Sequence, residues 1–454
     1  LFQHQTVQGL ASVARQGEEG VVIAQGPVHG PLELLPIQCD FLAQPIVARH
    51  HWNQALLLQP KQALQADALR QALGSIVTHH DVLRSRFLEQ AGCWQARIAA
   101  PISGDEDLLW VHEGVSLGQL VEVNAQAQAS LNLAQGPLLR AVLTTLDDGS
   151  QRLLLAIHHL VVDGVSWRIL LEDLQQAYSQ LLQGLPVQLP AKTSSVQAWA
   201  ERLSAWAQTQ AMQDELGYWA GVLRDAPLDL PCDRPQGSLR SRHRQVVRSR
   251  LDRQATRQLL QQAPAAYRTH VNDLLLTALA RTLCGWTGHA DALIQLEGHG
   301  REDVFAAIDL SRSVGWFTSL FPVRLTAHDD VAASLKAIKE QLRAVPAKGL
   351  GFGVLRYLGP QPVRDTLAAL PQPRVTFNYL GQFDASFDEG ALLVPAHEGA
   401  GAELSEDAPL GNWLEVEGQV YDGELEMRWT FSGAQFDTAT IDHLAGSCDE
   451  QLRA

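Results

Sequence analysis

The sequence has few of the residues that build disulfide frameworks, zinc sites or membrane spans. Its 454 residues include five cysteines, which are scattered and form no C-x-x-C pair. This pattern is typical of thiols in a reducing cytoplasm and gives no support to a disulfide framework or a metal site. No apolar run approaches the roughly 20 residues that a membrane-spanning helix needs. We therefore expect a cytoplasmic protein with no metal of its own and no membrane partner.

Basic residues are also outnumbered. The chain has 35 Lys and Arg against 50 Asp and Glu, a net charge of −15. Proteins that bind nucleic acid through charge usually present a basic surface, so this composition argues against nucleic acid as the main partner. Hydrophobic residues make up 46% of the chain, which is enough for a sizeable core. The length exceeds the usual single domain of roughly 50 to 250 residues, and two lobes are expected.

The start of the chain and one internal break suggest its organisation. Residues 1–30 show little periodicity and are interpreted as an interdomain linker. Residues 31–184 are expected to form an N-terminal lobe, because the Pro-containing stretch 185–192 then interrupts the pattern as an interlobe junction. Residues 193–454 are expected to form the C-terminal lobe. The first residue is not Met, and we expect the chain to be a segment of a longer protein.

Strand and helix patterns alternate in both halves, which favours an α/β sandwich in each lobe. The apolar run 152–157 predicts a buried strand, and the run 292–296 predicts another. Between Ser166 and Gly184, apolar residues at helical spacing predict a helix capped by Ser166. The Asp-Gly pair at 422–423 lies between two alternating runs and predicts a β-hairpin.

The densest cluster of reactive side chains follows the first of these strands, in the run His158-His159-Leu160-Val161-Val162-Asp163-Gly164. Successive side chains of an extended segment point to opposite faces, so only one of the two histidines easily faces a given cavity. That histidine can take or give a proton near neutral pH, and the other is interpreted as structural. Asp163, followed by the flexible Gly164, can tether the turn, and we expect Asp163 to pair with an arginine.

Four segments carry a resemblance to a known family. Residues 158–174, HHLVVDGVSWRILLEDL, resemble the HHxxxDG active-site motif of the condensation-type domains of nonribosomal peptide synthetases. Residues 297–302 (EGHGRE), 311–319 (SRSVGWFTS) and 377–384 (FNYLGQFD) resemble motifs of the epimerization branch and follow in that family's order. Asp40 departs from the pattern, because the family usually has an aromatic residue there. The chain is thus similar to an epimerization domain of the condensation-domain superfamily.

The resemblance implies both a fold and a place for the site. Domains of this superfamily consist of two α/β sandwich lobes, each like chloramphenicol acetyltransferase. The lobes form a V-shaped pseudo-dimer with the active site in a channel between them. We therefore expect the HHxxxDG motif in one lobe and the EGHGRE and NYLGQFD motifs in the other.

The resemblance also implies an activity, the inversion from L to D and back of an α-carbon. The substrate is an aminoacyl or peptidyl group held as a thioester on the 4′-phosphopantetheine of a carrier domain. Inversion needs a base on one face of the α-carbon and an acid on the other, and the family assigns these parts to His159 and Glu297. An enolate oxygen also needs hydrogen-bond donors. We expect them from Tyr379 or Asn378, and from the helix N-terminus near Ser166.

The remaining motif residues are expected to support this site. His158 and Gly164 hold the turn, Arg301 belongs to the loop scaffold, and Trp316 lies in the core or in the channel wall. The glycines around His299 lack the spacing of a phosphate-binding loop, so nucleotide binding is not expected.

The resemblance implies no cofactor beyond the phosphopantetheine of the partner. The expected partners are an upstream peptidyl carrier domain in the same chain and the condensation domain of the next module, and the domain alone is expected to be monomeric. Two alternatives stay open. A condensation domain that forms peptide bonds would use the same histidine without needing Glu297, and a catalytically silent module would only dock carrier domains.

Overall fold

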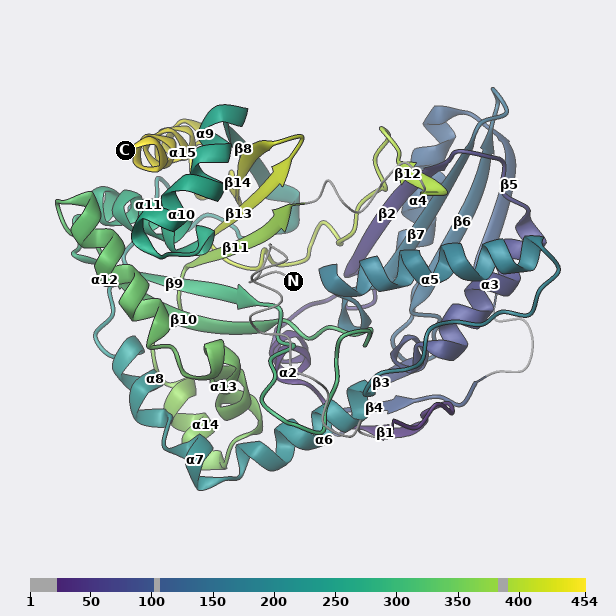
Figure 1. Cartoon of the computed structure of the whole chain (residues 1–454), viewed down its shortest axis with the longest axis horizontal. Helices are drawn as coiled ribbons and strands as arrows, with labels where there is room; N and C mark the ends of the chain where they lie inside the picture. Colours follow the sequence, from purple (N-terminus) through teal and green to yellow (C-terminus); the bar gives the residue numbers. More distant parts are fainter. Residues whose placement is uncertain (1–22, 102–106, 383–390) are drawn as a thin grey trace.

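The computed structural model describes residues 23–101, 107–382 and 391–454. The described chain forms two lobes that stand apart at one end and are joined at the other, near α2 (Pro36–Ala43) and α6 (Val196–Ala207) (Figure 1). Each lobe has its own sheet with helices packed on it.

The N-terminal lobe is built on a five-stranded sheet in the order β12-β2-β7-β6-β5. Its central strand β7 is buried along almost its whole length, as expected for a continuous apolar run that is covered on both faces. Helices α3 and α5 pack on the face that carries Leu153 and Leu155, and α4 packs on the face of Leu154. The elements are β2 (Asn53–Pro60), β5 (Leu109–Val115), β6 (Leu139–Leu146), β7 (Gln151–His158), β12 (Leu393–Pro395), α3 (Ala66–His79), α4 (Leu117–Ala129) and α5 (Gly164–Leu182).

A small three-stranded sheet lies beside this lobe, with the order β1-β4-β3. Its strands are β1 (Gly30–Leu32), β3 (Ser85–Gln90) and β4 (Cys93–Ile98). The neighbouring helix α2 packs against β10 (Ser319–Thr326), which belongs to the other lobe. Both lobes thus contribute to the joint at the base of the molecule.

The C-terminal lobe is built on a six-stranded sheet in the order β10-β9-β11-β13-β14-β8. Buried residues alternate with more accessible ones along β13, so one face of the sheet lies against helices and the other is polar. Helices α11, α12 and α15 contact this sheet and one another. The strands are β8 (Arg244–Leu251), β9 (Asp291–Gly298), β11 (Val375–Gln382), β13 (Leu414–Tyr421) and β14 (Glu424–Ser432).

Short and long helices complete this half of the chain. They are α7 (Gln210–Gln213), α8 (Leu216–Leu223), α9 (Arg253–Arg257), α10 (Ala263–Tyr267), α11 (Val271–Thr287), α12 (Val331–Arg343), α13 (Leu350–Gly353), α14 (Gln361–Ala368) and α15 (Thr438–Arg453). None of the described helices is both long and apolar enough to cross a bilayer.

Strand β12 crosses from the C-terminal half of the chain into the N-terminal sheet. It pairs antiparallel with β2, and the following segment continues the contact, because the Asn53 amide donates to the Glu403 carbonyl over 2.9 Å. Arg152 and Glu398 form an ion pair of 2.7 Å in the same region. The expected division of the chain into 31–184 and 193–454 did not anticipate this exchange.

The predicted strands and the hairpin are confirmed, whereas one helix start is corrected. Strands β7 and β9 contain the two apolar runs, and β13 and β14 form the hairpin around Asp422 and Gly423. The helix α5 begins at Gly164, with Asp163 rather than Ser166 as its cap. The Asp163 carboxylate accepts from the Ser166 amide over 2.9 Å, so the aspartate satisfies an amide that the helix leaves free.

The proposed linker and junction contact each other. Residues 1–22 of the predicted linker lie outside the described residues. Within the rest of it, Gln25 exchanges hydrogen bonds with the backbone of Lys192 at the end of the junction, over 2.8 and 3.2 Å. Gly30 already belongs to β1.

Candidate active site

His158 is the last residue of β7 and is fully buried. Its Nε2 donates to the Arg49 carbonyl over 2.7 Å, and its Nδ1 accepts from the Leu160 amide over 3.1 Å. Burial lowers the pKa of His158 to about 3. Both ring nitrogens are thus occupied by backbone groups, which leaves His158 a structural part of the turn.

His159 faces the other way and meets the C-terminal lobe. Its ring lies against Trp316, with ring centroids 4.1 Å apart. Nδ1 donates to the Val162 carbonyl over 2.9 Å, so the lone pair of the neutral ring is on Nε2. Desolvation by burial is the largest influence on the pKa of His159 and lowers it, which favours the neutral ring. Nε2 is therefore able to accept a proton.

Asp163 links the two lobes as well as capping α5. It is buried, and its carboxylate forms an ion pair with Arg301, whose Nη1 lies 2.7 Å from Oδ2. The same Oδ2 accepts from the Phe317 amide over 3.1 Å. Ser166 completes the junction, because its Oγ contacts both the carbonyl and the amide of Gly315 over 3.0 Å. The predicted pairing of Asp163 with an arginine is confirmed.

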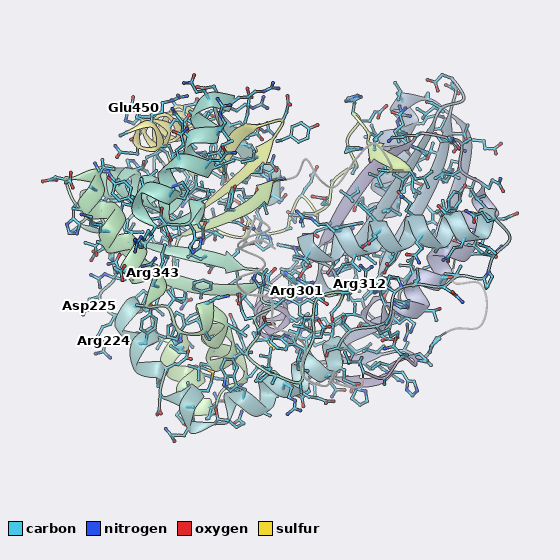
Figure 2. The ribbon with its side chains drawn as sticks, in the orientation of Figure 1. Arg224, Asp225, Arg301, Arg312, Arg343 and Glu450 are labelled. Atoms are coloured by element: carbon cyan, nitrogen blue, oxygen red, sulfur yellow. The ribbon has the colours of Figure 1, made fainter. Side chains whose placement is uncertain are left out.

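A second ion-pair network lies along α5. Arg312 contacts Glu172 over 2.8 Å and also Asp173, which in turn accepts from His80 over 2.9 Å. In Figure 2, Arg301 and Arg312 both lie where the two halves of the molecule meet. The segment 311–319 is thus anchored to the N-terminal lobe at two points.

Segment 311–319 leads from the histidine to Glu297. It runs from Trp316, on the His159 ring, into β10, where Leu320 pairs with Glu297 of β9. Gly300 lies so close to this segment that a Cβ atom there would come within 1.6 Å of the Phe317 carbonyl oxygen. Only glycine fits this position, which explains the glycine in the EGHGRE motif.

Glu297 lies near the end of β9, on the face of the sheet that is turned away from the helices. Its Oε2 accepts from Asn378 Nδ2 over 2.7 Å. Its side chain keeps exposed surface, yet protein surrounds the carboxyl closely enough to desolvate it. Desolvation, followed by the charges of Glu417 and Glu415, raises the pKa of Glu297 to about 8.

A row of polar side chains crosses this face of the sheet. Asn378 of β11 pairs in register with Glu417 of β13, which pairs with Arg428 of β14. Arg428 Nε donates to Glu417 over 2.9 Å. We call Glu297, Asn378, Glu417 and Arg428 the polar row. Within the row, the neutral donor Asn378 lies between the Glu297 carboxyl and Glu417, a carboxylate that Arg428 partly neutralises.

Tyr379 does not join this row. It is the next residue along β11 after Asn378 and points to the opposite face, where Gly418 is its cross-strand partner. A Cβ atom at Gly418 would lie 3.3 Å from the Tyr379 ring and 3.8 Å from Leu275 of α11. The Tyr379 hydroxyl is buried without a partner among the described residues, and desolvation raises its pKa to about 12. The structure brings Asn378 to Glu297 and leaves Tyr379 on the helix side.

Comparison with known proteins identifies this arrangement. The condensation-domain family matches residues 28–454. The chain belongs to the condensation-domain family. The crystal structure of the epimerization domain from the third module of tyrocidine synthetase B superposes with a TM-score of 0.88 and 35% identity, over 95% of this chain and 98% of that one. The X-domain from teicoplanin biosynthesis, at 19% identity and a TM-score of 0.74, shares the fold.

The curated relatives of this condensation-family chain are much longer. A linear gramicidin synthase of Brevibacillus parabrevis is 42% identical over the whole of this chain, which spans 9% of that protein. A surfactin synthase of Bacillus subtilis is 37% identical, again over the whole of this chain, which spans 13% of the relative. The expected superfamily and the two-lobed, chloramphenicol acetyltransferase-like fold are confirmed.

Two further motif residues have structural contacts. His299 Nδ1 accepts from the Arg301 amide over 3.0 Å, and its Nε2 lies 3.2 Å from Glu302, so it braces the EGHGRE loop. Asp40, the departure from the family pattern, accepts a hydrogen bond from the Tyr357 hydroxyl. Asp40 thus forms a polar contact between α2 and the C-terminal lobe.

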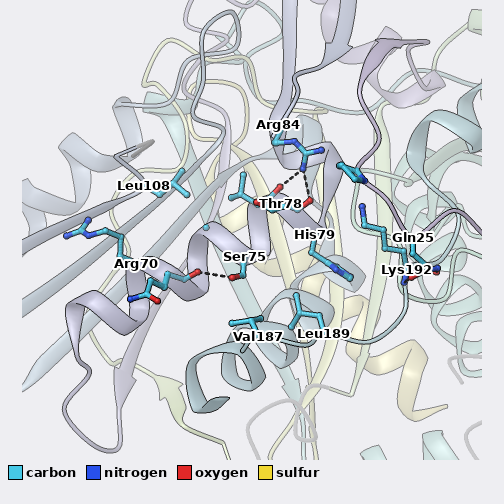
Figure 3. Close-up of a pocket in the computed structure, with 14 residues that line it drawn as sticks. Gln25, Arg70, Ser75, Thr78, His79, Arg84, Leu108, Val187, Leu189 and Lys192 are labelled. Carbon is cyan, nitrogen blue, oxygen red and sulfur yellow. Dashed lines mark hydrogen bonds between the residues drawn. The ribbon is translucent and has the colours of Figure 1, made fainter. Parts of the chain in front are cut away.

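A cavity of about 740 Å³ lies on the N-terminal lobe, away from His159. Figure 3 shows it between α3 and the junction residues Val187 to Lys192, with Arg70, His79 and Lys192 in its wall. It belongs to one lobe, and so it is not the channel that the sequence led us to expect. Lys192 is held by Asp81 over 2.8 Å, which keeps its charge at the rim.

His79, His80 and Asp173 bring three potential ligand atoms within 4.8 Å of one another. Asp173 is already bound by Arg312 and His80. Desolvation by burial lowers the pKa of His79 to about 4, and the charges of His80 and Lys192 act in the same direction. These nearby cations disfavour a metal ion, so the cluster is best described as part of the ion-pair network.

The site also contains Gln54, a residue to which the sequence analysis gave no role. Gln54 Nε2 lies 3.1 Å from Nε2 of His159. It comes there because β2 pairs with β7, with Asn53 opposite His158. Only the register between β2 and β7 shows that Gln54 lies near His159. A single sequence motif does not contain this information.

Proposed function

We propose that this chain inverts the α-carbon of an aminoacyl or peptidyl thioester, in both directions, in nonribosomal peptide biosynthesis. The proposal rests on two groups from different lobes, an imidazole with one ring nitrogen turned away from the backbone and a carboxyl held by the Asn378 amide. His159 comes from the N-terminal lobe, and Glu297 from the sheet of the C-terminal lobe. Each group is biased towards the protonation state that the reaction needs, since the pKa of His159 is lowered and that of Glu297 is raised.

The step conserves protons and electrons. His159 Nε2 takes the α-proton, and the electrons of the broken C–H bond move onto the thioester oxygen to form an enolate. The enolate then collapses, and the α-carbon takes a proton from Glu297 on its other face. This leaves an imidazolium and a carboxylate, which exchange protons with solvent to restore the starting state. In the reverse direction the two groups exchange roles.

The enolate oxygen needs hydrogen-bond donors. The positions of Asn378, Tyr379 and the N-terminus of α5 support these candidate donors to different degrees. Asn378 lies beside Glu297, on the polar row, which supports it. Tyr379 lies on the other face of β11, which supports it less. The N-terminus of α5 is already satisfied by the Asp163 carboxylate, and the negative charge of that group opposes the binding of a second anion there.

The substrate reaches these groups on a flexible arm in this proposal. The partner is a peptidyl carrier domain, upstream in the same longer chain, whose 4′-phosphopantetheine carries the thioester between the lobes. The condensation domain of the next module would then receive the product. The much greater length of the relatives is consistent with such neighbours.

The pH dependence follows from the two groups. With His159 as base, Glu297 must be protonated, so the rate should fall as pH rises through about 8 and the carboxyl ionises. The rate should also fall on the acidic side, where His159 becomes charged, below the ordinary range of histidine because its pKa is lowered.

A wash-in experiment tests the proposal. The chain is incubated in deuterated water with a carrier domain loaded with L-phenylalanine, and the released amino acid is analysed for deuterium and for chirality. We expect both deuterium and the D isomer. A silent docking module would give neither, and a condensation domain would give peptide bond formation with an acceptor but no D isomer.

The Glu297→Gln variant separates the two enzymatic alternatives. Inversion should fall roughly 100- to 10,000-fold, because the acid on the second face is lost. Peptide bond formation by a condensation domain should persist in this variant. Equal inversion rates for wild type and variant would exclude Glu297 as the acid.

A further inference from the structure

Gln54 lies in a directed chain of hydrogen bonds that ends on the base. Trp167 Nε1 donates to Gln54 Oε1 over 2.9 Å. The Gln54 nitrogen lies 3.1 Å from His159 Nε2, and His159 Nδ1 lies 2.9 Å from the Val162 carbonyl. Groups from β2, from α5 and from the turn after β7 are thus joined through one amide side chain.

The two ends of this chain fix its direction. The indole N–H of Trp167 can only donate, so it selects the oxygen of the Gln54 amide. The carbonyl of Val162 can only accept, so it places the ring proton of His159 on Nδ1. The Gln54 NH₂ group must then donate to the lone pair on Nε2. The orientation of the amide follows from its partners.

The NH₂ group of Gln54 has a second N–H that can still donate a hydrogen bond. Among the described residues, no other acceptor contacts the Gln54 nitrogen, and the side chain is only half-buried. A substrate whose α-proton is transferred to Nε2 has its thioester carbonyl attached to that α-carbon, within reach of the donor that lies 3.1 Å from the same nitrogen. The amide is therefore beside the place where the negative charge develops.

We propose that Gln54 is a further catalytic residue, which donates a hydrogen bond to the thioester oxygen as the enolate forms, and that Trp167 is the residue that positions it. This inference rests on the proposed epimerization. It adds a donor on the base side of the substrate, in the lobe opposite Asn378. The indole already orients the amide, so only the contact between Gln54 and Nε2 has to give way when that nitrogen takes the α-proton.

The test uses this chain with a carrier domain loaded with L-phenylalanine, and follows inversion and α-deuterium incorporation. Gln54→Met keeps the side-chain length and removes both N–H donors. We expect kcat to fall about 100- to 1,000-fold, as for the loss of one donor to an oxyanion, with little change in KM. Trp167→Phe keeps a ring but not the N–H, and kcat should fall about tenfold. Gln175→Met is the control, because Gln175 of α5 accepts from the Leu392 amide over 2.8 Å and contacts no group of the site among the described residues.

The pH profile separates catalysis from simple ring support. If Gln54 only held the His159 ring, its loss would move the acidic limb of the profile and leave the plateau unchanged. That result, or a Gln54→Met plateau equal to wild type, would overturn the assignment. Should Gln54→Met fail to fold, Trp167→Phe decides, since an unchanged rate there removes the oriented donor. A wild-type chain without any exchange would instead refute the proposed function itself.

Discussion

The base and the acid reach complementary protonation states by different physical routes. His159 is held by neutral partners, a carbonyl and an amide, and desolvation alone is enough to keep its ring uncharged. Glu297 lies on the polar face of its sheet near other carboxylates, and both desolvation and like charge favour its protonated form. The histidine site is therefore set by burial, whereas the carboxyl site is also set by charges that mutation can change one at a time.

The turn that carries His159 and the polar row around Glu297 differ in how much they contribute to the contact between the lobes. The turn that carries His159 also carries Asp163, which ties the lobes together through Arg301 and Phe317. The polar row carries no comparable contact to the N-terminal lobe among its four described members. We expect changes near the histidine to affect folding stability, and changes in the polar row to affect mainly the pH dependence of the rate.

The largest expected effect is on stability, at the lobe junction. Asp163→Asn leaves the buried Arg301 guanidinium without its charged partner and should lower the free energy of unfolding by roughly 3 to 5 kcal/mol. Urea denaturation followed by fluorescence measures this loss. Arg453→Gln removes the solvent-exposed pair with Asp252 and serves as control, with no measurable change expected. An unchanged midpoint for Asp163→Asn would contradict the junction role.

A change in the polar row should shift the alkaline limb of the rate profile. Glu417→Gln removes a like charge that raises the pKa of Glu297, so the alkaline midpoint should move from about 8 to roughly one pH unit lower. The other described charges near this face are Glu415 on β13, Arg428 on β14, and Glu403 and Arg244 beside them. Glu424→Gln, at the hairpin end of the same sheet, is the control.

The opposite shift should follow from the loss of the compensating cation. Arg428→Gln leaves Glu417 without its ion-pair partner, and the carboxylate should then act more strongly on Glu297. The alkaline midpoint should rise by less than one pH unit, because both groups are partly solvated. The same wash-in rates, measured from pH 6 to 10, give the midpoint. Shifts of the same sign in both variants would show that the row does not govern Glu297.

The smallest effect is expected at Tyr379. Tyr379→Phe removes a hydroxyl that has no partner among the described residues and lies on the helix side of β11. Inversion should stay within about twofold of wild type, and stability should change little, since the described residues offer this hydroxyl no hydrogen bond that the substitution would remove. A loss of tenfold or more would return Tyr379 to the list of enolate donors.

Much of the fold and part of the site could be predicted from the sequence. The apolar runs located β7 and β9, the Asp-Gly pair located the hairpin, and the motifs pointed to His159 and Glu297. The start of α5 was wrong by a few residues, because Asp163 and Ser166 are both good caps and only the three-dimensional contacts select between them.

Gln54, Glu417 and Arg428 could not be predicted in the same way. Each lies in a strand, where successive side chains point to opposite faces. This alternation does not reveal which residues of the neighbouring strand lie opposite. Their proximity to His159 or Glu297 depends on which residues face each other across β2 and β7, or across β11, β13 and β14. A shift of one residue in either register would turn these side chains to the opposite face.

The sequence by itself determined the two-lobed α/β class, the order of the motifs and the chemical types available for proton transfer, since these depend on local periodicity and on residue identity. The tertiary structure alone decided which histidine has a ring nitrogen that no backbone group occupies, which neighbour of Glu297 contacts it, and that β12 joins the opposite lobe. Those outcomes depend on strand register and burial, which arise from contacts between residues far apart in the chain.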